Sequence, residues 1–187
     1  MRVTTVSSQG SVSEPIRKGP TITIMAEEEP IEIGFPMVAA YHGQSALAMA
    51  AIVFQAQRAA FALLSPKAVP ARRDISIVSG HPGPGVRDAF EVITRAVTRG
   101  AYIVDRSLPD ARFVPGHDIS YSFRMTLGER TAEMALRPDV LPARFFELVF
   151  TKSRTTAQEQ ELSALKRAVA QDVLARAPET LFTTRVS

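Results

Sequence analysis

The chain has 187 residues, of which 45% are hydrophobic and 22% are charged, and this is the composition of an ordinary globular domain. It contains no cysteine, which excludes disulfides, thiolate zinc sites, iron–sulfur clusters and cysteine nucleophiles. The formal net charge is +3 and no cluster of lysine and arginine accompanies it, so we expect no nucleic-acid partner.

The beginning of the chain indicates a tail followed by one domain. Residues 1–20 are rich in Ser, Thr, Gly and Pro without periodicity, and we expect them to form a flexible tail before a single domain over residues 21–187. The N-terminus lacks a charged segment followed by an apolar one, so we expect no signal peptide and a cytoplasmic location. Residues 21–25 alternate as a short strand does, and residues 27–30 are typical of a solvated turn.

The most apolar stretch, residues 44–64, carries its large side chains at helical spacing and predicts one long helix. It is nearly as long as a membrane span of about 20 residues. Gln55, Gln57 and Arg58 lie in its second half, however, and centrally placed charge is costly in lipid. We therefore expect no membrane span but a central helix buried against a sheet. Its alanine faces also suit close packing on a second helix, including one from another subunit.

The central part of the chain predicts a strand, a rigid loop, a helix and a second strand. The β-branched run at residues 75–78 predicts the first strand, and the loop that follows alternates glycine with proline around His81. The helix begins near Val86 with its apolar side chains on one face, and Gly100 stands where a glycine would end it. Residues 102–105 predict the second strand.

The last third of the chain predicts a hairpin, a further strand and a helix. Residues 119–127 alternate cleanly and pair through a turn with residues 131–137. Residues 145–151 are predicted to form a further strand. A capping box over residues 156–159 begins the last helix, which Pro178 stops. Together the elements predict an α+β fold in which a mixed or antiparallel sheet packs against the long central apolar helix and further helices.

The three histidines of the chain, His42, His81 and His117, each lie beside a glycine in a predicted loop. Three histidines can form an open site for zinc or another divalent metal if the fold brings them together, and each can also be a loop histidine with ordinary partners. His42 directly precedes the long helix, whose N-terminus favours a bound anion and a neutral imidazole. Asp88 and Asp118 are candidate ligands, or carboxylates that orient a histidine.

The loop at residues 79–85 is also similar to an anion cradle, with Gly83 and Gly85 as candidate ligand-binding residues. Its two prolines remove N–H groups that such a cradle uses, and no Lys-Ser/Thr follows, so we do not expect a nucleotide P-loop. A hydrolytic triad with Ser45 or Ser79 is open as well, although the chain contains no G-x-S-x-G pattern.

Three segments occur in the order in which one known family carries its motifs. Tyr41-His42-Gly43, ahead of the long helix, is similar to an aromatic-His-Gly-His-x-Cys start. Asp-Ala-Phe-Glu-Val-Ile-Thr at residues 88–94, with Thr-Arg-Gly at residues 98–100, is similar to an Asp-Ala-hydrophobic segment and its glycine-rich turn. The last helix and residues 177–182 are similar to the usual ending. Over residues 36–187 the chain therefore resembles the FmdE family, whose members are related to a component of formylmethanofuran dehydrogenase.

This resemblance implies an α+β fold, a homodimer, and a metal, often zinc, that is held through His and Cys residues. Only His42 matches a ligand position, because the second histidine of the family falls at Gln44 and its cysteine at about Ala46; the zinc-ribbon appendage of some members is absent too. His81 is our own candidate for a replacement ligand. The candidate ligand-binding residues of a pocket near His42 are Tyr41, His42, Gln44, Gly83, Gly85 and Asp88.

Three functions follow as alternatives. The first is an FmdE-like binding domain that holds a metal ion or a small anionic ligand between His42 and residues 79–88, as an accessory to one-carbon or molybdenum/tungsten enzymes. The second is a metal-free scaffold or dimerisation protein that lost the ancestral site together with the cysteines. The third is a small hydrolase or lyase that uses histidine acid/base chemistry, with Asp88 or Asp118 orienting the imidazole.

Overall fold

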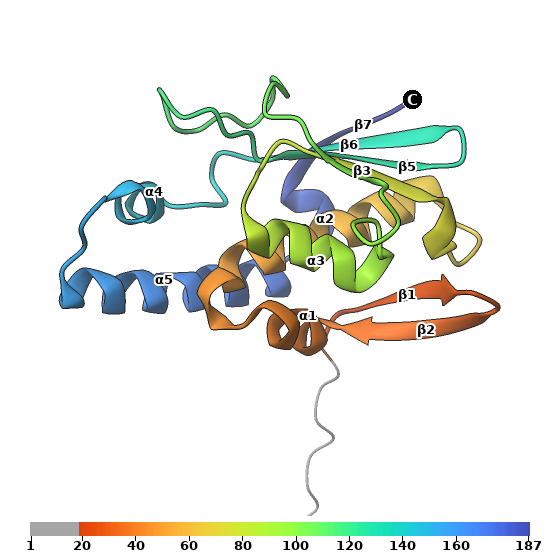
Figure 1. The fold of residues 1–187 in the computed structure, drawn as a ribbon, viewed down its shortest axis with the longest axis horizontal. Coiled ribbons are helices and arrows are strands. Elements are labelled where there is room, and N and C mark those ends of the chain that lie inside the picture. Colours follow the sequence, from red (N-terminus) through yellow and green to blue (C-terminus); the bar gives the residue numbers. More distant parts are fainter. Residues whose placement is uncertain (1–18) are drawn as a thin grey trace, which may run out of the picture.

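A five-stranded sheet and a central helix organise the fold (Figure 1). The computed structural model describes residues 19–187, so residues 1–18 of the predicted flexible tail lie outside the described residues. The elements of the described chain are, in order, β1 (Thr21–Ala26), β2 (Glu29–Gly34), α1 (Phe35–His42), η1 (Gln44–Ala46), α2 (Leu47–Leu64), η2 (Arg72–Asp74), β3 (Ile75–Ser79), α3 (Pro84–Thr94), β4 (Tyr102–Val104), β5 (Ser122–Leu127), β6 (Arg130–Leu136), α4 (Ala143–Phe150), α5 (Thr156–Ala175), η3 (Pro178–Thr180) and β7 (Phe182–Val186).

The large sheet has the strand order β4-β3-β5-β6-β7, and β1 and β2 form a separate hairpin. β3 and β4 run parallel while the other neighbours are antiparallel, so the sheet is mixed. β5 and β6 form the predicted hairpin, in which Met125 pairs with Ala132 and both side chains are buried in the core. The α+β fold predicted from the sequence, with a mixed sheet against a long helix, is confirmed.

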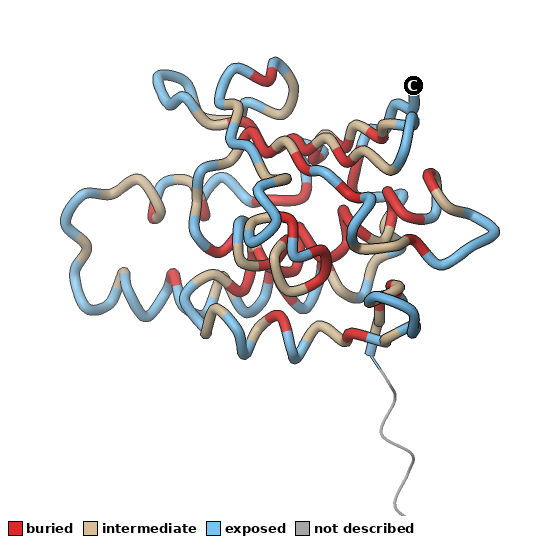
Figure 2. The backbone as a smooth tube through the Cα atoms, turned by 45° about the vertical axis from the view of Figure 1, so that its right-hand side comes forward, coloured by how far each residue is buried: buried red, intermediate tan, exposed pale blue. Residues whose placement is uncertain are grey.

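Helix α2 lies between the sheet and the other helices, and the buried segments gather around it in the middle of the molecule (Figures 1 and 2). Most of its 18 residues are buried, because β5, β6 and β7 cover one side and α1, α3 and α5 cover the others. Gln44–Leu64 is the one helical stretch among residues 19–187 that is long and apolar enough to cross a membrane, and 83% of the apolar window is buried inside the protein. This burial identifies α2 as a core helix, as expected.

Two buried glutamines fix the neighbouring helices to α2. The side-chain amide of Gln55 donates to the carbonyl oxygens of Val173 (2.7 Å) and Arg176 (2.9 Å), at the end of α5. The side-chain amide of Gln57 donates to the carbonyl oxygen of Ala89 in α3 (3.1 Å). The polar residues that argued against a membrane span thus make hydrogen bonds inside the core, and one of them holds α3 in place beside the candidate site.

The strand predicted at residues 145–151 is wrong, because most of this segment forms helix α4. Phe145 and Leu148 are both buried three residues apart, which is helical spacing, so these side chains pack as one face of a short helix.

The capping box of α5 lies one residue earlier than predicted. Thr155 accepts from the backbone N–H of Gln158 (3.2 Å), whose side chain accepts in turn from the Thr155 N–H (2.9 Å).

Helix α3 ends at Thr94 and not at Gly100 as predicted. Arg95 takes a left-handed conformation with a φ of 54°, which turns the chain out of the helix. The Glu91 carboxylate then accepts a hydrogen bond from the backbone N–H of Val97 (2.8 Å). A side-chain acceptor therefore ends this helix before the glycine is reached.

Candidate functional site

His42 owes its place to a break between two helices. Helix α1 ends at His42, and Gly43 follows with a φ of 89°, a conformation that glycine adopts without strain. The chain then turns through η1 into α2, so His42 lies at the junction of the two helices. Its side chain is 15% exposed.

The loop between β3 and α3 holds His81 in one orientation. The Ser79 hydroxyl donates to the His81 carbonyl oxygen (3.0 Å), and the Gly83 N–H donates to Nδ1 of the His81 ring (3.0 Å). A Cβ on Gly83 would lie 2.7 Å from Cε1 of this ring, so a side chain at this position would displace the ring. On its other side the ring meets Tyr121 edge to face, with ring centroids 5.0 Å apart.

The first turns of α3 bring a carboxylate to His42. Nδ1 of His42 lies 2.7 Å from Oδ2 of Asp88. This approach depends on Gly85, because a Cβ there would lie 2.2 Å from Cβ of Ala46 and 3.4 Å from Nε2 of His42. Any larger residue would force α3 away from η1 and disturb the His42–Asp88 pair.

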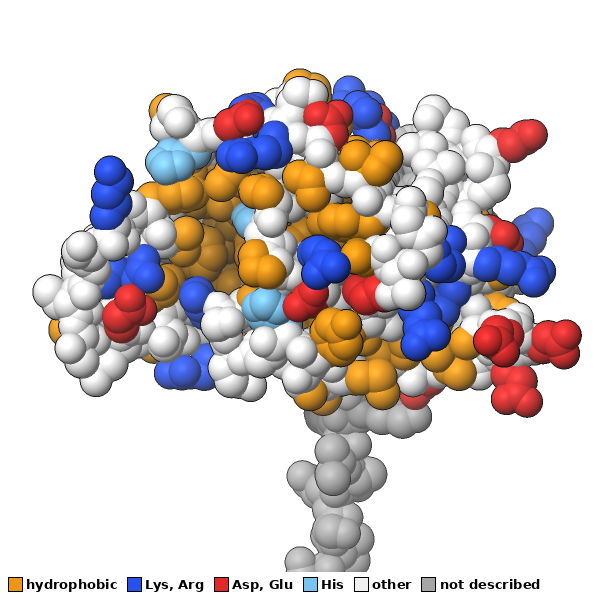
Figure 3. Space-filling view, in the orientation of Figure 1, with side chains coloured by type: hydrophobic (Ala, Val, Ile, Leu, Met, Phe, Trp, Pro, Cys, Tyr) orange, Lys and Arg blue, Asp and Glu red, His pale blue; other side chains and the backbone are white. Residues whose placement is uncertain are grey.

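His42 and His81 line one cavity of about 240 Å³. Figure 3 shows a hollow in this face of the molecule, with mostly hydrophobic walls and histidine side chains near its edge. The hydrophobic residues that line the cavity are Ala46, Ala48, Met49, Pro84, Val86, Tyr121, Phe145 and Val149. Pockets for drug-sized ligands typically measure about 300–1,000 Å³, so this cavity suits a smaller molecule.

Lys166 brings a positive charge to the cavity from α5. Among residues 19–187 its ammonium group makes no ion pair or hydrogen bond, and Glu159, whose charge raises its pKa, is itself paired with Arg154 at 2.8 Å. Burial lowers the pKa of Lys166, and the charge of Arg154 lowers it further. Burial removes part of the water around this ammonium group, so Lys166 provides the cavity with an unpaired positive charge.

Burial also sets the charge of two other groups that line the cavity. It lowers the pKa of His81 to about 4, so this imidazole is neutral at physiological pH. It raises the pKa of Tyr121 to about 12, so the phenol keeps its proton. Lys166 therefore shares the cavity with two neutral polar side chains.

The structure brings together five of the residues predicted for the site. His42, His81, Gly83 and Gly85 line the cavity, and Asp88 is hydrogen-bonded to His42 at its edge. The N–H of Gly83 already donates to Nδ1 of His81. The role of the two glycines is to let the histidine rings and the helices approach closely.

Other predicted site residues lie outside the cavity. Tyr41 is 60% exposed on α1, and Gln44 is exposed in η1. His117 stacks on Phe150 with ring centroids 3.9 Å apart, and the exposed Asp118 accepts a hydrogen bond from an arginine in the same loop. None of these four predicted residues lines the cavity that His42 and His81 share.

The three-histidine metal site predicted from the sequence is not assembled. Among residues 19–187, no three His, Cys, Asp or Glu side chains lie close enough together to hold a metal ion. Nδ1 of His42 is hydrogen-bonded to Asp88, and Nδ1 of His81 is hydrogen-bonded to the N–H of Gly83. One nitrogen on each ring is therefore left to bind a ligand. Protein sites for zinc use three or four ligands, so this donor set does not fit zinc.

The sequence reasoning missed Tyr121, which directly precedes β5, and the side chains that enter from α4 and α5. Lys166 is one of many charged residues along α5, and nothing in its spacing marks it. Phe145 and Val149 would have been found by treating residues 143–150 as an amphipathic helix, because they lie four residues apart on its inner side. Within residues 19–187, Ser45 makes no hydrogen bond to a histidine and Ser79 bonds His81 only through its backbone, so neither serine pairs with an imidazole there.

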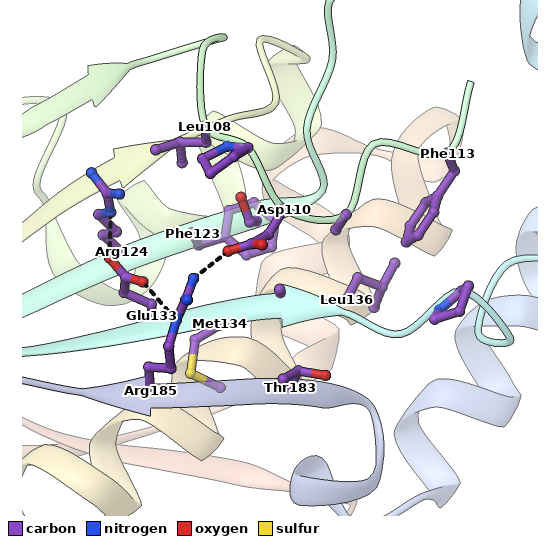
Figure 4. A pocket seen from close by; sticks show the side chains of 15 residues that line it. Leu108, Asp110, Phe113, Phe123, Arg124, Glu133, Met134, Leu136, Thr183 and Arg185 are labelled. Carbon is purple, nitrogen blue, oxygen red and sulfur yellow. Dashed lines mark hydrogen bonds and ion pairs between the residues drawn. The ribbon is translucent and has the colours of Figure 1, made fainter. Parts of the chain in front are cut away.

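A second cavity, of about 320 Å³, lies on the face of the sheet away from α2 (Figure 4). Its charged side chains are paired with one another. Arg124 donates to Glu133 (2.7 Å), and Arg185 contacts Glu133 (3.2 Å) and Asp110. Because no charge in this group lacks a partner, we place the candidate site in the cavity that His42 and His81 line.

Comparison with models of known protein families and with curated proteins finds no match to this chain. The resemblance to the FmdE family therefore stays a prediction, and the function has to be argued from the chemistry of the cavity.

Proposed function

We propose that the protein binds a small organic anion in the cavity between the start of α2, the loop before α3, and helices α4 and α5. The observation that carries this proposal is Lys166, a cation without a partner among residues 19–187 that lines a mostly hydrophobic cavity. Met49, Phe145 and Val149 offer an apolar surface for the body of the ligand. An accessory role beside one-carbon or molybdenum/tungsten enzymes is part of this proposal and rests on the FmdE resemblance alone.

A titration with small monocarboxylates tests the proposal, with benzoate and isovalerate as probes and ligand-observed NMR as the readout. We expect Lys166→Met to weaken binding by about tenfold or more, because it removes a charge-assisted bond while keeping the length of the side chain. Lys67→Met is the matched control, since Lys67 is exposed beyond the far end of α2. Equal binding by the wild type and Lys166→Met would contradict the proposal, and a wild type that binds no carboxylate would favour the scaffold alternative.

The second candidate is an acid/base enzyme, and the His42–Asp88 pair favours it. A carboxylate 2.7 Å from Nδ1 orients the ring, and Nε2 has no partner within the described residues. This is the arrangement of a general base, as a small hydrolase or lyase would use it. Turnover of a panel of small esters and hydroxy acids is the test. Activity should vanish in His42→Gln, and a wild type that turns over nothing in the panel leaves the binding function in first place.

A homodimer and a cytoplasmic location complete the proposal. Met37 and Tyr41, 56% and 60% exposed on α1, provide an apolar surface that a second copy can cover. The burial of α2 in the core supports a protein that does not span a membrane through this helix, and the cytoplasmic location rests on the sequence alone. Light scattering over a range of protein concentrations tests the dimer, and a monomer at every concentration would exclude it.

A further inference from the structure

The two imidazoles of the cavity are held in opposite tautomers. A backbone N–H can only donate, so Nδ1 of His81, which receives the Gly83 N–H at 3.0 Å, must be the unprotonated nitrogen. The proton of the neutral ring therefore sits on Nε2. His81 can offer a ligand only a hydrogen-bond donor.

His42 has the reverse arrangement. An ionised carboxylate can only accept, so Nδ1 of His42, 2.7 Å from Oδ2 of Asp88, carries the proton. In the ring that carries this one proton, Nε2 is then an acceptor. It lies on the side of the ring that faces Gly85, and Gly85 lines the cavity. Whatever binds beside His42 has to bring a donor.

Lys166 adds the third requirement. Lys166 lines the same cavity, its ammonium group makes no ion pair or hydrogen bond to any described residue, and the one acid that acts on it is already paired. An anionic group of the ligand can therefore bind Lys166 and the Nε2–H of His81 together, in a cavity of about 240 Å³ that leaves room for only a small hydrophobic body.

We propose that the ligand is a small hydroxy carboxylic acid, whose carboxylate binds Lys166 and the Nε2–H of His81 and whose hydroxyl donates to Nε2 of His42. This inference rests on the proposed function and specifies its ligand class. Aliphatic or aromatic substituents of the acid lie against Met49 and Phe145. The same geometry makes His42 the group that accepts the hydroxyl proton if the bound acid reacts.

Matched pairs of acids that differ only in the hydroxyl test this inference. Lactate is compared with propionate, alpha-hydroxyisovalerate with isovalerate, and mandelate with phenylacetate. The Kd of each acid is measured by NMR titration. We expect each hydroxy acid to bind the wild type about tenfold more tightly than its partner, because an unpaired hydroxyl or imidazole acceptor in a closed site is costly. Lys166→Met should weaken both members of a pair equally.

Variants of His42 and Asp88 test whether the tautomer of His42 causes the hydroxyl preference or whether a general loss of structure does. His42→Phe should remove the hydroxyl preference and keep the Lys166-dependent binding of carboxylates. The side chain of Asp88→Asn can donate as well as accept, so it no longer fixes the proton of His42 on Nδ1. This variant should bind hydroxy acids and their partners with similar affinity, and should bind pyruvate better relative to lactate. His117→Ala, outside the cavity, should change nothing.

The outcomes distinguish this inference from the proposed function. Carboxylates that bind through Lys166 with no hydroxyl preference overturn the hydroxy-acid ligand and leave anion binding intact. A preference that persists in His42→Phe and in Asp88→Asn overturns it as well. If no acid of either series binds at millimolar concentration, both the ligand class and the anion-binding function fail.

Discussion

The burial of His81 should make the protein less stable as the pH falls, over a defined range. The pKa of this imidazole is lowered from 6.5 to about 4 in the folded protein, because burial penalises its charged form. Above pH 6.5 the ring is neutral in both the folded and the unfolded chain. Between pH 6.5 and about 4 the unfolded chain takes up a proton that the folded chain refuses, so protonation favours unfolding. Below about pH 4 both states are charged and the loss levels off.

The size of this loss follows from the shift in pKa. At 1.36 kcal/mol for each pKa unit, a shift from 6.5 to about 4 removes about 3 kcal/mol of unfolding free energy. This is a large share of the ~5–15 kcal/mol that stabilises a typical domain. Tyr121 and the Gly83 N–H, which contact the ring, are neutral, and burial is the cause of the shift.

Urea denaturation of the wild type and of His81→Gln, at pH values between about 7 and 4, measures the effect. Glutamine stays neutral and its side-chain oxygen can accept the Gly83 N–H, so the difference between the two proteins isolates the imidazole. The wild type should lose about 3 kcal/mol relative to the variant over this range. Parallel stability curves for the two proteins would refute the reasoning, because they would mean that the folded protein protonates His81 as freely as the unfolded chain does.

Three further substitutions test the packing around the site and the core. Gly85→Ala should destabilise the protein by about 1–3 kcal/mol and reduce ligand binding, because the new Cβ meets Ala46; a melting temperature equal to that of the wild type would speak against this contact. Gln55→Leu should cost about 2 kcal/mol or more in urea denaturation, since it leaves two carbonyl oxygens at the end of α5 without their donor; a neutral result would mean that water replaces the amide. Thr155→Ala removes the N-cap of α5 and should cost about 1 kcal/mol, while Thr155→Ser should restore most of it.

The elements that were predicted correctly are those with a strong local pattern. Helix α2 carries its apolar residues at helical spacing over a long stretch, and β5 and β6 alternate on both sides of a turn. α4 was misassigned because its aromatic residues have a high strand propensity, and only packing against the core decides between the two structures. β7 was missed because it owes its conformation to pairing with β6, which is distant in the sequence.

The candidate site was predictable where the chain itself imposes the geometry. The single glycine beside each of His42 and His81 indicated that these two rings lie in constrained loops, and Asp88 was a candidate partner by its position in α3. The packing of the helices decides two further features of the site. It places His117 apart from the other histidines, and it brings Lys166 into the cavity from α5. No pattern within a single segment contains that information.

The central position of α2 has a consequence for how the molecule opens. Helix α2 is covered by the helices that touch it and by strands β5, β6 and β7. All of these elements would have to separate from α2 before water could reach its amide groups. Its backbone amides should therefore exchange with deuterium only through global unfolding, as one cooperative unit. The β1–β2 hairpin, by contrast, touches the rest of the chain mainly through α1 and η2, and its amides should exchange through local opening at a much lower free energy. A ligand bound between the start of α2 and α5 would slow both the exchange of α2 and the unfolding of the whole domain, while the hairpin would continue to exchange at its own rate.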